Sequence, residues 1–285
     1  MSKYTIYVVI YNYKSSNLLD SVRSVYENVS DKANVHMYIY DQHPLNRKDK
    51  FSGFPNLEYE HVFWDHQYTP INYKKKEALS NVHPYTMLMS ADISLDKDWD
   101  LALVDQLGAH KDSIISGQGK VNLKIHDKYF VRNAYPQFSD SFLLSNYIDR
   151  NLVFSTRDTL ARVEFPTHMK YWGEEEMMSV DSFVKDIRIY SCPLGYYTDN
   201  HERNLERLYS PFSIEHNYNA FLDYINDSHG PLQSKVAQFF EYHNIDPSKI
   251  KRIPYQVDDV LYDPNSMNIV GIGGERFIDG VNTIA

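Results

Sequence analysis

The chain has 285 residues, with 29 basic and 38 acidic side chains, a formal net charge of −9 with histidine neutral, and 24 tyrosines. This length can bury a sizeable core in one large or two small domains, which argues against disorder, and the acidic balance argues against a domain that holds nucleic acid by bulk charge. No stretch approaches the roughly 18 apolar residues of a membrane helix, the start lacks a secretory signal, and Cys192 is the only cysteine, so we expect a cytoplasmic protein without an intrachain disulfide or a thiolate zinc site.

The first predicted elements form a β-α-β unit. Residues 4–11 and 35–41 are β-branched and aromatic runs typical of buried strands. The polar residues 15–17 offer a helix cap, and the apolar residues after them recur at three- and four-residue spacing. A right-handed crossover makes the two strands parallel and opens a crevice at their carboxyl ends. We expect Asn12 and Asp41 to line this crevice.

The alternation of strands and helices continues along the chain. Residues 57–64 and 85–92 have strand patterns, and residues 71–82 between them have a helical one. A short helix follows over residues 99–107, and Gly108 suits the position just beyond its end.

Later segments predict additions to this core. Residues 112–165 hold strand-like patches that indicate an added mixed sheet, and two helical patterns lie at 214–225 and 231–240. We therefore expect an α/β fold, a Rossmann-like mixed sheet flanked by helices, in a catalytic domain over residues 1–205. A helical C-terminal extension over residues 206–285 would pack on it.

One candidate for chemistry is the acid at the end of the fourth predicted strand. Asp92 directly follows a buried run, where a carboxylate costs burial energy unless it is solvated, paired or bound to a metal. Alternatively, Asp92, Asp96 and Asp98 cap the helix that begins at Trp99, a position that Asp favours. The sequence leaves both interpretations open.

A second candidate is an acidic run. Gly173 breaks the chain, and Glu174, Glu175 and Glu176 open a helical pattern. Acids in a first helical turn are favoured by the helix dipole alone. One of them could instead project into the crevice as a general base or a charge stabiliser.

A third candidate is the strand and turn that carry His201 and Arg203. One carboxylate, one imidazole and a bound diphosphate would make a mostly-oxygen site for Mn²⁺ or Mg²⁺, and the imidazole favours Mn²⁺. The metal would stabilise departing phosphate oxygens as a Lewis acid. No dinucleotide fingerprint, P-loop, zincin or nucleophile-elbow motif occurs, and the glycine-rich residues 271–277 open no β-α-β unit.

In this order, the segments resemble nucleotide-sugar glycosyltransferases of the GT-A type. Among these, the resemblance is to polypeptide N-acetylglucosaminyltransferases that act on protein hydroxyls. The likeness covers most of the chain. It rests on residues 6–29, 69–79, 88–100, 163–183, 189–204 and 268–281.

The resemblance implies a donor site with a divalent cation. The triplet from Ser90 to Asp92 takes the place of the family's acidic metal-binding triplet, with Ser90 replacing the first acid. Asp92 would then be the metal ligand there and His201 the second protein ligand. Arg203 would contact the diphosphate of a UDP-sugar.

The resemblance also assigns residues around the donor and the acceptor. Glu174 and Glu175 match the family's acidic segment near the acceptor and the sugar. Lys74 stands where the family usually has Arg, and Asn12 and Asp41 would contact the nucleoside. Members of the group are retaining, which implies an α-type transfer with stabilisation of the leaving group by the metal.

The expected activity is that of a metal-dependent hexosyl- or pentosyltransferase with a macromolecular hydroxyl as acceptor. A protein Ser, Thr or hydroxyproline is the family expectation. The richness in Tyr, Asn, Lys and Ile resembles AT-biased coding common in tailed bacteriophages, which glycosylate hydroxymethylated pyrimidines in their DNA. We therefore rank a hydroxymethylated DNA base first, which would place the enzyme in a host cytoplasm, and a protein second.

A DNA acceptor would need a cationic track, for which residues 47–50 and 249–252 are candidates. Two other hypotheses describe a protein without catalytic activity. One is a sugar-binding module, motivated by Ser90, and the other is a DNA-binding accessory protein, which the net charge disfavours.

Overall fold

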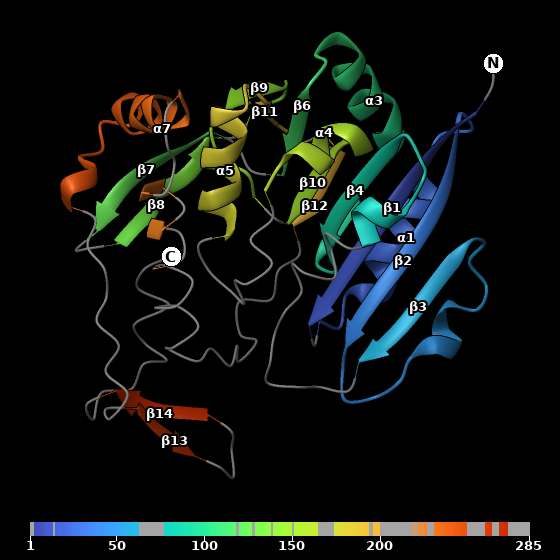
Figure 1. The fold of residues 1–285 in the computed structure, drawn as a ribbon. Coiled ribbons are helices and arrows are strands. Elements are labelled where there is room, and N and C mark those ends of the chain that lie inside the picture. Colours follow the sequence, from blue (N-terminus) through green and yellow to red (C-terminus); the bar gives the residue numbers. More distant parts are fainter. Residues whose placement is uncertain are drawn as a thin grey trace.

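The computed structural model describes most of the N-terminal two thirds of the chain and parts of the remainder (Figure 1). The described residues are 3–13, 15–62, 77–117, 120–126, 129–137, 139–149, 151–164, 174–193, 196–199, 219, 222–223, 225–226, 231–249, 260–263 and 268–272.

Helices and strands alternate through the first half of the chain and then give way to a more mixed order. The α-helices are α1 (Leu18–Asn28), α3 (Trp99–Ala109), α4 (Arg157–Arg162), α5 (Glu174–Val184) and α7 (Pro231–Tyr242), and η1 (Lys48–Phe51) and η3 (Pro247–Lys249) are 3-10 helices. The strands are β1 (Tyr4–Tyr13), β2 (Ala33–Gln42), β3 (Leu57–Val62), β4 (Tyr85–Ser90), β5 (Ile93–Leu95), β6 (Ser113–Ser116), β7 (Lys120–His126), β8 (Tyr129–Gln137), β9 (Leu143–Ser145), β10 (Leu152–Thr156), β11 (Arg188–Ser191), β12 (Tyr197–Asp199), β13 (Val260–Asp263) and β14 (Asn268–Ile272).

The central feature is an eight-stranded mixed sheet in the order β3-β2-β1-β4-β10-β6-β11-β9. The pairs β1–β2, β2–β3 and β1–β4 are parallel, whereas β10 runs antiparallel to both of its neighbours. The carboxyl ends of β1, β2, β3 and β4 therefore lie at one edge of the sheet, which is where open α/β sheets bind ligands.

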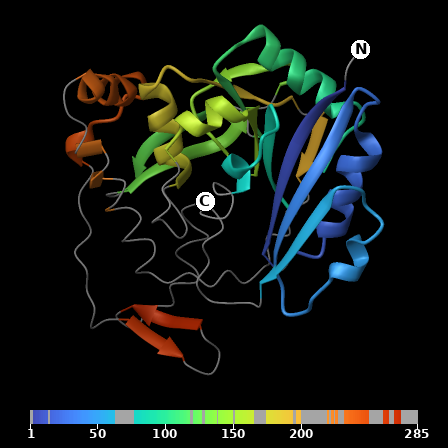
Figure 2. The same cartoon turned by 45° about the vertical axis from the view of Figure 1, so that its right-hand side comes forward.

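Helices cover both faces of the sheet, which makes a three-layer α/β fold (Figure 2). On one face, the apolar sides of α1 and α3 pack against β1, β2 and β4, and Trp99 is fully buried there. On the other face, α4 and α5 contribute Leu160 and Met178 to a second core. Burial of these apolar side chains on both faces fixes the strand register and so the positions of the polar residues at the strand ends.

The α/β class predicted from the sequence is confirmed. Of the helix predicted over residues 71–82, residues 77–80 are helical and residues 71–76 lie outside the described residues. The position of Gly108 is a correction, because α3 continues through it to Ala109. The N–H of His110 bonds to the carbonyl of Gln106 at 3.0 Å, so the helix ends without a left-handed residue at Gly108, and Asp112 is the next residue with positive φ.

The C-terminal region holds the helix expected behind Pro231, which is α7. Residues 219, 222–223 and 225–226 are also helical. The antiparallel pair β13 and β14 adds strands to a region for which only helices were expected. Among the described residues, no helix is both long and apolar enough to cross a bilayer.

Candidate functional site

Polar side chains gather where the parallel strands end. The register of β1 with β2 places Asn12 opposite Asp41, and the register of β1 with β4 places Tyr11 opposite Ser90. Asp92 lies two residues after Ser90. The sheet therefore brings four residues predicted for the site, Asn12, Asp41, Ser90 and Asp92, to one edge.

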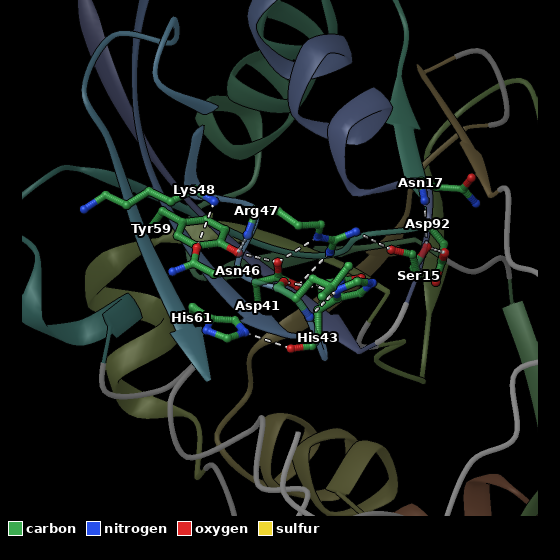
Figure 3. Close-up of polar contacts among 12 residues, drawn as sticks. Ser15, Asn17, Asp41, His43, Asn46, Arg47, Lys48, Tyr59, His61 and Asp92 are labelled. Atoms are coloured by element: carbon green, nitrogen blue, oxygen red, sulfur yellow. Dashed lines mark hydrogen bonds and ion pairs between the residues drawn. The ribbon is translucent and has the colours of Figure 1, made fainter. Parts of the chain in front are cut away.

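Asp41 accepts four hydrogen bonds (Figure 3). Asn12 Nδ2 and Arg47 Nη2 each donate to Oδ1 at 2.7 Å, while Arg47 Nε donates to Oδ2 at 3.0 Å and the Tyr59 hydroxyl at 2.6 Å. Burial opposes ionisation, but the hydrogen bonds from Arg47, Tyr59 and Asn12 outweigh it and hold the pKa of Asp41 below its ordinary value. Asp41 is thus an ionised carboxylate whose charge Arg47 balances.

Tyr59 holds both members of this ion pair. Burial and the hydrogen bond to Asp41 raise the pKa of Tyr59 to about 12, so its phenol stays a donor at neutral pH. The same oxygen accepts the backbone N–H of Arg47 at 3.1 Å. The loop between β2 and η1 is therefore fixed at the residue that pairs with Asp41.

Ser15 connects this ion pair to Asp92. Arg47 Nη1 donates to the backbone carbonyl of Ser15 at 3.2 Å, and the Ser15 hydroxyl donates to Asp92 Oδ1 at 2.5 Å. The backbone N–H of Asn17 donates to that hydroxyl at 3.0 Å, and Ser90 makes a longer contact of 3.4 Å to Asp92 Oδ2. Figure 3 shows the resulting chain from Asp41 through Arg47 and Ser15 to Asp92.

These contacts exclude one of the two interpretations of Asp92, the capping of α3. Its carboxylate is buried and bonds to Ser15, so it does not cap α3. Asp98 occupies the position before the helix in a left-handed conformation with φ 58°, and its side chain makes no capping bond. Asp92 is a buried acid at the end of a core strand, where it needs a partner or a bound ion.

A second cluster of carboxylates lies at the start of α5. The hydroxyl of the buried Tyr147 is 2.9 Å from Glu175 Oε2 and 3.2 Å from Glu176 Oε1. Ser179 ties the two segments together, because its hydroxyl accepts the backbone N–H of Ile148 at 2.9 Å and donates to the carbonyl of Glu175 at 2.5 Å. The loop before β10 thus holds the first turn of α5.

The same loop reaches the end of β4. The backbone N–H of Ser90 donates to the carbonyl of Asn151 at 2.8 Å, and the N–H of Asp149 donates to the Ser116 hydroxyl at 2.7 Å. Residues 147–149 and 151 therefore join the acidic start of α5 to the strand end that precedes Asp92.

Four further predicted site residues have side chains that the structure does not describe. Glu174 begins α5, but its side chain lies outside the described residues, as do Lys74, His201 and Arg203. Among the described residues, no group of three or more His, Cys, Asp or Glu side chains could hold a metal ion. Of the two predicted metal ligands, only Asp92 lies among the described residues.

Sequence reasoning missed the site roles of Ser15, Arg47, Tyr59 and Tyr147. Ser15 was considered only as a helix cap, but its hydroxyl also donates a hydrogen bond to Asp92. Arg47 was assigned to an exposed cationic track, which the structure corrects, because its side chain is 10% exposed and paired with Asp41. No periodic signal in the sequence joins these residues to their partners.

Comparisons with known proteins were informative only at the level of structure. No family model matches the sequence, and the search of curated protein sequences gave no match. A structure of GalNAc-T7 with UDP, GalNAc and Mn²⁺ aligns with a TM-score of 0.62 at 15% identity, over 90% of this chain and 60% of that one. This chain thus spans about three fifths of that protein's length.

The Staphylococcus aureus protein TarS gives a similar result. Its residues 1–349 in complex with UDP-GlcNAc align with a TM-score of 0.61 at 13% identity, over 84% of this chain and 72% of that one. The mixed sheet with helices on both faces is the GT-A fold of these glycosyltransferases, as expected from the sequence. Identities this low establish the fold and leave the activity to be argued from the site.

Proposed function

We propose that the protein is a glycosyltransferase that moves a sugar from a nucleoside-diphosphate donor, a uridine one, to a macromolecular hydroxyl. The chain of contacts from Asp41 through Arg47 and Ser15 to Asp92 carries this proposal. It runs along the carboxyl edge of the sheet, where α/β folds bind nucleotides. The solved structures of similar fold, which hold UDP or UDP-GlcNAc, support it.

We infer that a divalent cation binds at the Asp92 end of this edge. Asp92 offers a hard carboxylate oxygen that the Ser15 hydroxyl holds in place, and such oxygens are what Mn²⁺ and Mg²⁺ bind. We assign Asp92 and His201 as its protein ligands, with Ser90 beside them. When bound, the metal supplies Lewis-acid stabilisation of the leaving diphosphate.

The remaining residues are assigned by the resemblance of their motifs. Arg203 and Lys74 would neutralise the diphosphate, and Asn12 and Asp41 would form the nucleoside end of the site. Glu174 and Glu175 would lie near the sugar and the acceptor, as a base or as charge stabilisers. The contact of Glu175 with the buried Tyr147 supports this role, because it fixes a carboxylate at the helix start.

The transfer balances without an external reactant. The bond from the sugar C1 to the diphosphate oxygen breaks, a bond from C1 to the acceptor oxygen forms, and the acceptor proton leaves to a carboxylate or to the departing diphosphate. We propose retention of the anomeric configuration, as in the resembling family. We further propose that residues 1–205 form the catalytic domain and that residues 206–285 form an extension of it.

For the acceptor, a hydroxymethylated DNA base is the first candidate to test and a protein hydroxyl the second. The 5-substituent of a pyrimidine projects into the major groove, so an enzyme can reach it without flipping the base. The pairing of Arg47 with Asp41 removes one cation from the first segment of the proposed DNA track and leaves Lys48 and Lys50 there, which weakens the preference for DNA over protein. Residues 250–252 of the second segment lie outside the described residues.

The test is to incubate the full chain with Mn²⁺, a panel of UDP-sugars and both acceptor classes, and to record acceptor masses and free UDP. The proposal predicts that one donor adds one sugar mass to one class. The replacement of the first triplet acid by Ser90 motivates the rival hypothesis of a non-catalytic module. Sugar binding that needs no Mn²⁺ and releases no UDP would support that rival and overturn the proposal.

A further inference from the structure

We propose that Arg47, rather than Asp41, contacts the base of the donor nucleotide, and that it selects a base with a carbonyl oxygen at the contacted edge. This inference rests on the proposed function. It follows from which hydrogen-bonding groups around Asp41 remain available to a ligand.

Asp41 has no hydrogen-bonding capacity left. A carboxylate has about four lone-pair positions, and Asn12, Tyr59 and two nitrogens of Arg47 fill four on Asp41. Asn12 and Asp41 are both 0% exposed, so neither offers a surface in this arrangement. A base that bonded to Asp41 would have to displace one of these donors.

Arg47 pairs with Asp41 and has N–H groups that this pairing does not use. A guanidinium has five N–H groups, and the described residues accept from three, two at Asp41 and one at the carbonyl of Ser15. Its side chain is 10% exposed. Two N–H groups therefore remain on a guanidinium held from both sides, which leaves it little freedom to reorient.

The backbone also holds Arg47 in place. The N–H of Arg47 donates to the Tyr59 hydroxyl at 3.1 Å, and His61 Nε2 donates to the carbonyl of His43 at 2.8 Å. The loop from β2 to η1 is thus attached to β3 at two points. Because the loop is fixed before any ligand arrives, the remaining donors have a set direction, which favours specific recognition.

Charge identifies the kind of acceptor. Asp41 balances the charge of Arg47, so a second anion such as a phosphate would meet the negative field of Asp41 at close range. A neutral carbonyl oxygen carries no such penalty. We place position 4 of the base at Arg47, because both pyrimidines carry a carbonyl at position 2. Uracil presents a carbonyl at position 4, whereas cytosine presents an amino group there, and that donor would face the donors of Arg47.

The test is isothermal titration calorimetry of UDP and CDP with the full chain in the presence of Mn²⁺. These two ligands differ only in the base. The wild-type chain should bind UDP about tenfold or more tightly than CDP, since a mispaired polar contact costs roughly that factor. Arg47→Lys keeps the ion pair with Asp41 but loses the guanidinium fork, and should reduce the ratio to about threefold or less.

Arg23→Lys is the matched control, because it makes the same substitution at an exposed arginine of α1, which pairs with Asp20 outside this cluster. It should keep the wild-type ratio. Equal binding of UDP and CDP by the wild-type chain, or an unchanged ratio in Arg47→Lys, would overturn this inference alone. A wild-type chain that binds neither nucleotide would overturn the proposed function as well.

Discussion

The two carboxylate clusters of the site differ in how the carboxylates share hydrogen-bond donors. At the ends of β1, β2 and β3, Asp41 faces one guanidinium and two neutral donors, which use its full bonding capacity. At the start of α5, Glu175 and Glu176 both approach the single hydroxyl of Tyr147. One phenolic proton can be donated to only one carboxylate at a time.

The difference separates a rigid end of the site from an adaptable one. The Asp41 end is closed around one geometry before any ligand binds, which suits recognition of a constant group such as a nucleotide. At the α5 end, the Tyr147 hydroxyl lies within hydrogen-bonding distance of two carboxylates, so a ligand hydroxyl or a proton can change which of them it bonds to. Under the proposed function, the first is the donor end and the second the acceptor end.

Removal of the carboxylate at the rigid end should have the largest effect on stability. Asp41→Ala leaves the buried Arg47 without its counter-charge, and breaking a buried pair costs about 3–5 kcal/mol. Urea denaturation measures this loss in unfolding free energy. Asp20→Ala removes an exposed ion pair and is the control, with an expected change within about 0.5 kcal/mol. A loss in Asp41→Ala no larger than in the control would contradict a rigid end.

The link between the rigid end and the metal ligand can be broken at Ser15. Ser15→Ala removes the hydroxyl that orients Asp92, and loss of such a partner typically weakens metal binding about 10- to 100-fold. Titration of Mn²⁺ binding by electron paramagnetic resonance in the presence of UDP measures it. Ser52→Ala, an exposed serine on η1's flank, should leave the affinity unchanged. Wild-type affinity in Ser15→Ala would separate Asp92 from this network.

The adaptable end should respond in turnover rather than in nucleotide binding. Tyr147→Phe removes the donor shared by Glu175 and Glu176 without changing the ring, and should lower kcat about tenfold. The affinity for UDP, measured by calorimetry, should stay within about twofold of wild type, since this cluster lies outside the donor network. A change in UDP affinity as large as that in kcat would show that the two ends are one unit.

The smallest effect is a pH dependence of stability at the rigid end. The pKa of Asp41 is lowered from its ordinary 3.8 on folding, so its stabilisation is fully present above about pH 4 and is lost as pH falls through the lower folded pKa. The difference in unfolding free energy between wild type and Asp41→Asn should therefore be constant at neutral pH and shrink below about pH 4. A difference that stays constant through this acidic range would contradict an ionised Asp41.

The sequence predicted the frame of this site better than its contacts. Strand periodicity placed Asn12, Asp41 and Asp92 at strand ends, and the parallel β-α-β order put those ends at one edge, because both follow from local pattern and chain handedness. The partner of Asp41 was missed because Arg47 follows it across an irregular loop, where side-chain direction has no period.

The choice between capping and site roles could also not be made from residue types. Ser and Asp serve equally as helix caps and as members of buried networks. Only the packing of α1 against the sheet, which brings Ser15 to Asp92, decides between them. The contact of Tyr147 with Glu175 could likewise not be predicted, because the two residues lie 28 positions apart and Tyr147 belongs to a segment without regular periodicity.

The central claim is that Asp92 is a ligand of a divalent cation that promotes departure of the nucleoside diphosphate. Its most direct test is the rate of Mn²⁺-dependent UDP release from the UDP-sugar in Asp92→Asn and in Asp98→Asn, whose Asp precedes α3 without a capping bond. The account predicts a loss of about a hundredfold or more in Asp92→Asn and wild-type release in Asp98→Asn. Wild-type release in a folded Asp92→Asn variant would contradict it.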